Sequence, residues 1–146
     1  RLTTIPVISK KILTTFSERL FGLGLGNCDT SAFALCNTPF YQKHSSLNYN
    51  WFSSAFTFIE TGYIGVGLAN AFFVIVGFCA LSVKRQGKGS DLYADMAIVM
   101  SVVCIALFYY NSSLRTDIAY IAYFILALPF VGNQRHSYNV YAHQCG

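Results

Sequence analysis

Long apolar runs separated by short polar segments dominate the second half of the chain. The clearest run covers residues 63–83, which hold no charged side chain. As a helix rising 1.5 Å per residue, it would extend about 30 Å, the thickness of the hydrocarbon core of a bilayer. Two shorter runs follow, and together the three predict transmembrane helices over about residues 62–83, 94–111 and 117–132.

The positions of basic residues predict how these helices are oriented. Lys84, Arg85 and Lys88 follow the first run directly, and cytoplasmic loops of membrane proteins are enriched in Lys and Arg. We therefore expect residues 84–94 and 132–146 inside the cell, and residues 1–61 and 111–117 outside it. The expected fold is an all-α integral membrane protein with an extracytoplasmic N-terminal half, residues 1–61, and a membrane part, residues 62–146.

Composition supports this class of protein. Charged residues make up only 11% of the chain and hydrophobic residues 54%, whereas about 25% of an average soluble chain is charged. The net charge of +4 comes from scattered basic residues, so we expect no nucleic-acid partner. The chain begins at Arg1 without a Met, and we expect it to be a fragment of a longer protein.

The N-terminal half begins with an amphipathic pattern. Apolar residues recur at spacings of three and four over residues 1–20, which predicts one amphipathic helix with a stripe of Ile5, Ile8, Ile12, Phe16 and Leu20. Such a helix could pack on the rest of the protein or lie on a membrane surface.

Alternating glycines follow this helix. Gly22, Gly24 and Gly26 each weaken a helix by about 1 kcal/mol, so we expect a turn whose backbone approaches another segment closely. Beyond the polar loop that comes next, the aromatic residues of 47–60 predict a helix at the membrane–water boundary; these residues are Trp51, Phe52, Phe56 and Phe58.

Cysteines suggest a disulfide rather than a metal site. Cys28 and Cys36 share the outer loop and could form a disulfide in an oxidising compartment. His136, His143 and Cys145 gather in the tail, but their spacing fits no zinc pattern. We expect neither a metal nor a cofactor.

The order of these motifs resembles that of a known family. The glycine segment LFGLGLGN (residues 20–27) precedes a polar loop, which is followed by Glu60-Thr-Gly62-Tyr-Ile-Gly65 at the start of the first apolar run. Over residues 20–80 this resembles the C-terminal part of the bacterial O-antigen polymerase and ligase superfamily, most closely the polymerases that assemble exopolysaccharide or capsule repeat units. The related ligases carry a His eleven residues before the first glycine of that helix, where this chain has Trp51.

The resemblance implies a membrane glycosyltransferase of the bacterial cytoplasmic (inner) membrane, within a cell envelope that builds lipopolysaccharide or exopolysaccharide. It would join oligosaccharide repeat units carried on polyprenyl pyrophosphate outside that membrane. Its partners would be the bilayer, the lipid-linked glycan and other polysaccharide assembly proteins. The reaction needs a base for the acceptor hydroxyl and cations for the departing pyrophosphate.

Candidate residues for these roles come from both halves of the chain. His44 and Glu60 are candidate bases, since both are proton acceptors beside the outer loop. Arg115 is the first candidate for pyrophosphate, because guanidinium binds phosphate oxygens in bidentate fashion; the further substrate-binding candidates are Arg19, Lys43 and, by stacking on sugars, Trp51. Gly22, Gly24, Gly26, Gly62 and Gly65 are expected to be structural, allowing close backbone contact.

Other interpretations of the same residues remain open. Arg115 could be a snorkelling anchor at a helix end, Glu60 a carboxylate that only hydrogen-bonds a neighbouring segment, and His44 an ordinary solvated side chain. The whole chain could instead be a three-span membrane scaffold or accessory subunit without catalytic activity. A transporter fits less well, because the apolar runs carry no ionisable residues at their centres.

Overall fold

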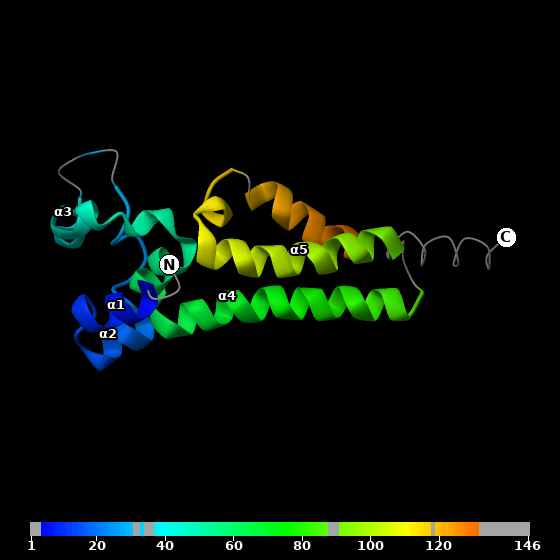
Figure 1. The fold of residues 1–146 in the computed structure, drawn as a ribbon, viewed down its shortest axis with the longest axis horizontal. Helices are drawn as coiled ribbons and strands as arrows, with labels where there is room; N and C mark the ends of the chain where they lie inside the picture. The colour runs from blue at the N-terminus through cyan, green and yellow to red at the C-terminus, as the bar shows by residue number, and fades with distance from the viewer. Residues whose placement is uncertain (1–3, 31–32, 34–36, 88–90, 118, 132–146) are drawn as a thin grey trace, which may run out of the picture. The chain divides into compact units, whose positions relative to one another are not determined.

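The computed structural model describes residues 4–30, 33, 37–87, 91–117 and 119–131. Over these residues the chain is helical and has no strand (Figure 1). The chain divides into two compact units. The first comprises Arg1–Asn70 with Leu107–Arg115, and the second comprises Ala71–Ala106 with Thr116–Gly146.

Two short helices replace the single amphipathic helix predicted over residues 1–20. They are α1, Thr4–Lys11, and α2, Phe16–Phe21. The break covers residues 12–15. The second helix begins after Thr15 because Thr15 is its N-cap, and the Thr15 backbone N–H donates to Glu18 Oε2 over 3.1 Å. The predicted stripe is therefore wrong in its second half, since Phe16 is 78% exposed.

The loop between the glycine segment and α4 contains further short helices. These are α3, Pro39–His44, and the 3₁₀ turns η2, Ser45–Leu47, and η3, Tyr49–Trp51. Thr38 joins α3 to the glycine segment: its Oγ1 accepts from the Tyr41 N–H over 3.2 Å and donates to the Asn27 carbonyl over 2.6 Å. Capping by a Thr side chain, followed by Pro39 in the first turn, explains why α3 begins there.

The long helix α4, Ser53–Arg85, begins well before the predicted span and is broken at Gly62, where φ is +65° and ψ −160°. The segment before the break belongs to the core of the first unit. Phe56 and Phe58 are buried there, so their rings pack against other side chains of the protein. They belong to a cluster with buried residues of α1 and the turn after it, the loop, α4 itself and the end of α5, namely Ile8, Leu13, Cys28, Tyr49, Ala55, Ile59, Val66 and Phe108.

The second unit contains α4 from Ala71 onward and, as far as Ala106, the helix α5, Asp91–Tyr110; the two run antiparallel beside each other. Small residues fill their interface: a Cβ at Gly77 would lie 2.7 Å from Ser101 Oγ, and that hydroxyl donates to the Phe73 carbonyl over 2.6 Å. Lys84 and Asp95 form a 2.6 Å ion pair near the connection of the two helices. Close contact through small residues is typical of helices that pack within a membrane.

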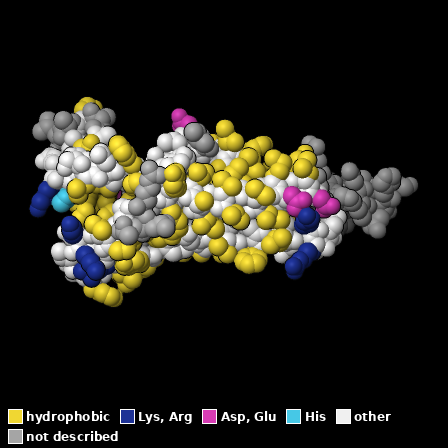
Figure 2. Space-filling view, viewed as in Figure 1, with side chains coloured by type: hydrophobic (Ala, Val, Ile, Leu, Met, Phe, Trp, Pro, Cys, Tyr) yellow, Lys and Arg dark blue, Asp and Glu magenta, His cyan; other side chains and the backbone are white. Residues whose placement is uncertain are grey.

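Large apolar side chains of these helices point outward instead. Leu68, Phe78 and Val102 are each at least 65% exposed, and hydrophobic side chains cover much of the visible surface of α4 and α5 (Figure 2). Both helices are long and apolar enough to cross a bilayer. The third predicted span corresponds to an apolar helix described over Ala119–Val131.

Candidate functional site

The glycine segment binds α4 at its break. A helix break leaves the preceding carbonyls without their usual donors, and two of them are used here. The Leu23 N–H donates to the Ile59 carbonyl over 2.8 Å, and the Gly24 N–H donates to the Glu60 carbonyl over 3.0 Å. A third bond reaches a side chain: the Gly26 N–H donates to Glu60 Oε1 over 2.9 Å. The two sequence motifs therefore meet at one place.

Gly22 and Gly62 make this approach sterically possible. A Cβ at Gly22 would overlap the backbone of Glu60 and Thr61, and a Cβ at Gly62 would overlap the Leu20 carbonyl. Both glycines have positive φ, a conformation that residues with a Cβ adopt only at a cost. The predicted non-helical turn with close backbone approach is confirmed at Gly22.

The other predicted structural glycines differ in their surroundings. Gly24 and Gly26 lie in the same turn with positive φ. Gly65 lies inside α4, where a Cβ would overlap the side chain of Thr61. That side chain is held in place because its Oγ1 donates to the Thr57 carbonyl over 2.6 Å.

Arg115 lies in the same unit, at the end of η4, Ser113–Arg115. Its guanidinium carbon stands 3.2 Å from the centroid of the Phe56 ring, a cation–π contact. Its Nη2 is 3.6 Å from Asp29 Oδ2, and its Nη1 donates to the Asn50 carbonyl over 3.5 Å. Since the two polar contacts are long and the side chain is 26% exposed, the guanidinium retains donors for another anion.

Electrostatics link Arg115 to the buried carboxylate. Burial lowers the pKa of the Arg115 guanidinium, and the charges of Asp29 and Glu60 oppose that shift. An Arg side chain nevertheless stays charged in proteins. Glu60 is only 9% exposed, so water and salt screen its charge less than that of a surface carboxylate.

Cys28 and Tyr49 complete the cluster. The Tyr49 hydroxyl donates to the Cys28 carbonyl over 2.8 Å, and both residues are buried. Burial, reinforced by Glu60 for the thiol and by Cys28 for the phenol, raises the pKa of each group to about 12. The expected disulfide partner of Cys28, Cys36, lies outside the described residues.

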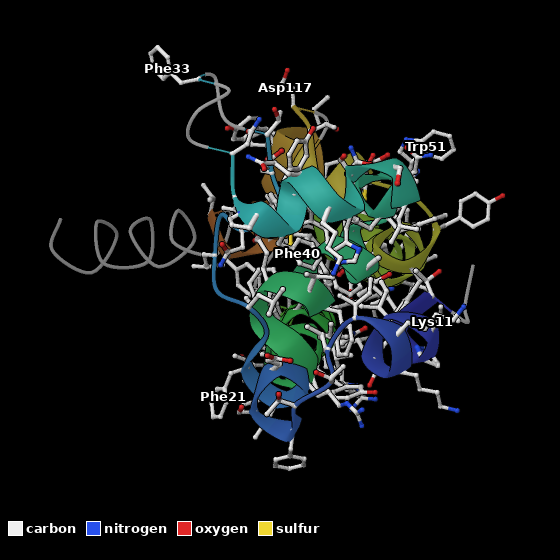
Figure 3. All side chains as sticks on the ribbon, turned by 90° about the vertical axis from the view of Figure 1, so that its left-hand side faces the viewer. Lys11, Phe21, Phe33, Phe40, Trp51 and Asp117 are labelled. Carbon is white, nitrogen blue, oxygen red and sulfur yellow. The ribbon has the colours of Figure 1, made fainter. Side chains whose placement is uncertain are left out.

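The remaining predicted site residues lie elsewhere in the first unit. His44 packs its ring on Phe40, with centroids 4.8 Å apart, and Lys43 is exposed. Arg19 Nε donates to the Leu13 carbonyl over 2.8 Å and so stabilises the connection between α1 and α2. Trp51 is 64% exposed and points away from the helices (Figure 3). Within the described chain, none of these four shares a hydrogen bond or ion pair with Glu60 or Arg115.

Sequence reasoning did not find Asp29, Tyr49 or Phe56 as parts of this cluster. No local motif marks them, because each contacts a partner distant in sequence. No group of three metal-ligating side chains occurs in the described ranges. The tail residues His136, His143 and Cys145 lie outside them.

Comparisons with protein-family models, with curated proteins and with solved structures found no match to this chain.

Proposed function

We propose that this chain is part of a polymerase-like glycosyltransferase of the bacterial cytoplasmic membrane, which joins oligosaccharide repeat units carried on polyprenyl pyrophosphate. The resemblance of its motifs suggests this chemistry. The observation that carries the proposal is the hydrogen bond between the Gly26 N–H and Glu60 Oε1. It brings together the two motifs on which the resemblance rests, around a buried carboxylate in the unit that also contains Arg115.

The membrane part of the proposal is supported by the helices. Two of them are long and apolar enough to cross a bilayer, and their interface is built from small residues while large apolar residues face outward. A soluble protein would rarely leave so many large apolar side chains in water. If Lys84 and Arg85 lie on the cytoplasmic side, the other end of the helix formed by residues 63–83 lies outside the membrane, and Glu60 would be extracytoplasmic.

Glu60 and Arg115 would share the chemistry. Arg115 would hold the pyrophosphate, whose negative charge grows as the bond to the sugar breaks. Its 3.6 Å pairing with Asp29 is long enough for a phosphate oxygen to replace the carboxylate. Glu60 would accept the proton of the acceptor hydroxyl. The structure favours Glu60 over His44 as the base, because the Glu60 carboxylate lies where the two motifs meet, whereas the His44 ring packs on Phe40.

Glycan chain length in cells tests these roles, using the full-length protein that contains this chain. Arg115→Lys should shorten the glycan, because an ammonium lacks the bidentate geometry of guanidinium; Glu60→Gln should shorten it as well, since loss of a general base slows transfer about 10²–10⁴-fold. Matched controls are Arg85→Lys, at the other end of α4, and Glu18→Gln, whose amide can still accept the Thr15 N–H.

The proposal fails if Glu60→Gln and Arg115→Lys, at parental protein levels, both leave long chains. The scaffold interpretation would then gain support. It is favoured by one observation: Arg115 is already paired with Asp29 and stacked on Phe56, as expected of a structural cluster. Under that interpretation the two substitutions lower the amount of folded protein without a separate effect on chain length.

A further inference from the structure

The short helix α2 exposes an unusual amount of apolar surface. It has no buried residue, and the side chains of Phe16, Phe21 and, in the following turn, Leu25 are 78%, 63% and 80% exposed. Figure 3 shows Phe21 pointing away from the rest of the first unit. We call Phe16, Phe21 and Leu25 the α2 patch. Apolar side chains that are exposed together in this way mark a surface that contacts another molecule or a membrane.

Backbone contacts fix the level of α2 along α4. The end of α2 touches the helix break, since a Cβ at Gly62 would overlap the Leu20 carbonyl. Leu23 and Gly24 then bond the carbonyls of Ile59 and Glu60. The α2 patch is thus held at the level of the break, immediately before the uncharged run of residues 63–83 begins.

Exposed apolar residues continue from this level along α4. Tyr63, Ile64 and Leu68 are 48%, 40% and 67% exposed and belong to the same unit. If residues 63–83 cross a bilayer, the break lies at its surface, where amphipathic helices insert their apolar side chains to a shallow depth. This step rests on the membrane part of the proposed function.

Charge indicates which kind of surface the patch would meet. The last turn of α1 carries Lys10 and Lys11, both exposed. Lys side chains at a membrane surface contribute about 1 kcal/mol each towards binding anionic lipids. We propose that α2 lies in the headgroup layer of an anionic phospholipid bilayer, with the α2 patch inserted and the two lysines contacting lipid phosphates.

Tryptophan fluorescence provides the test, because Trp51 is the only tryptophan of the chain. Trp51 lies just before α4, and no residue of the α2 patch is adjacent to it in the sequence. The parent protein therefore provides the reference signal. In a Trp51→Phe background, Phe16→Trp or Phe21→Trp places the probe in the α2 patch, and Leu68→Trp places it on the proposed membrane helix.

The proteins are reconstituted into vesicles of phosphatidylcholine and phosphatidylglycerol whose acyl chains carry bromine. Both α2 probes should lose fluorescence to the bromine relative to vesicles without bromine, with blue-shifted emission. Replacing the phosphatidylglycerol by phosphatidylcholine should weaken the quenching of the α2 probes and leave that of Leu68→Trp unchanged. Unaltered circular dichroism confirms that each variant keeps the helical content of the parent.

Three results would overturn the inference, and they differ in what else they affect. Quenching at Leu68→Trp without quenching at either α2 probe rejects the docking of α2 but leaves the membrane helices standing. Absence of quenching at Leu68→Trp rejects the membrane part of the proposed function as well. Shielding of the α2 probes from both bromine and aqueous iodide indicates that protein, such as a second copy, covers the patch.

Discussion

Replacing Gly62 with alanine should strongly destabilise the first unit. Gly62 joins the two parts of α4 with φ +65° and ψ −160°, a region that is almost restricted to glycine. An alanine methyl group would also overlap the Leu20 carbonyl. That obstacle is backbone, so no side-chain rotation can relieve it, and the end of α2 must move away from α4.

The cost can be worked out from two contributions. Holding a residue other than glycine in this conformation costs about 1–3 kcal/mol. Moving α2 would break the hydrogen bonds that Leu23 and Gly24 donate to α4, and each of them contributes about 1 kcal/mol to stability. The expected loss is therefore about 3–5 kcal/mol in the free energy of unfolding. For a chain of this length it corresponds to a fall in Tm of roughly 10 °C.

Thermal unfolding in detergent, followed by circular dichroism, measures this effect. The matched control is Gly67→Ala in the same helix, where an added Cβ has no atom within 4 Å. Alanine at such a helical position should stabilise by about 0.5–1 kcal/mol, so the two substitutions should shift Tm in opposite directions. A shift of the same sign and size for both would refute the assigned role of the break.

Three further predictions concern the cluster around Arg115. Tyr49→Phe should lower the free energy of unfolding by about 1–3 kcal/mol, because the buried Cys28 carbonyl loses its 2.8 Å donor; an unchanged denaturation midpoint would contradict this. The free energy of unfolding should fall between about pH 9 and 12. Folding raises the pKa of Cys28 from 9.0 and that of Tyr49 from 10.0, each to about 12. The unfolded chain therefore loses these two protons at a lower pH than the folded protein does, and rising pH favours the unfolded chain. Cys28→Ala with Tyr49→Phe should flatten that fall, and a slope equal to that of the parent would count against it. Asp29→Asn should change the free energy of unfolding by less than about 0.5 kcal/mol, because Asp29 is 63% exposed and 3.6 Å from Arg115; a loss of several kcal/mol would show that the pair is structural.

Local patterns in the sequence were sufficient for the long helices. The apolar run after Gly62 forms the second part of α4, and the run around Cys104 corresponds to α5, because long uninterrupted apolar runs are typical of helices. The boundary at Thr15 was also readable: Thr15 and Glu18 have the spacing of a capping box. The apolar spacing alone predicted a single helix over residues 1–20, whereas the capping box marks the start of a second helix at Phe16.

Long-range contacts were not predictable in the same way. The alternating glycines indicated that the backbone at Gly22 approaches another segment closely. No pattern in the sequence indicated that this segment is the break of α4 at Gly62. Phe56 looked like a boundary aromatic because its neighbours in sequence are aromatic too. It is instead buried, stacked beneath Arg115 from a distant turn. A contact between segments that are far apart in the chain depends on the fold, and a single sequence does not encode it in any local spacing.

Accessibility of cysteines in intact cells tests the central claim, that residues 63–83 cross the membrane and leave Glu60 outside. Native cysteines are replaced by alanine, and one cysteine is introduced at exposed Ser46, beside His44, or at exposed Gln86, beyond Lys84. A maleimide that cannot cross membranes should label Ser46→Cys in intact cells and Gln86→Cys only after permeabilisation. Labelling of Gln86→Cys but not Ser46→Cys in intact cells would contradict the account.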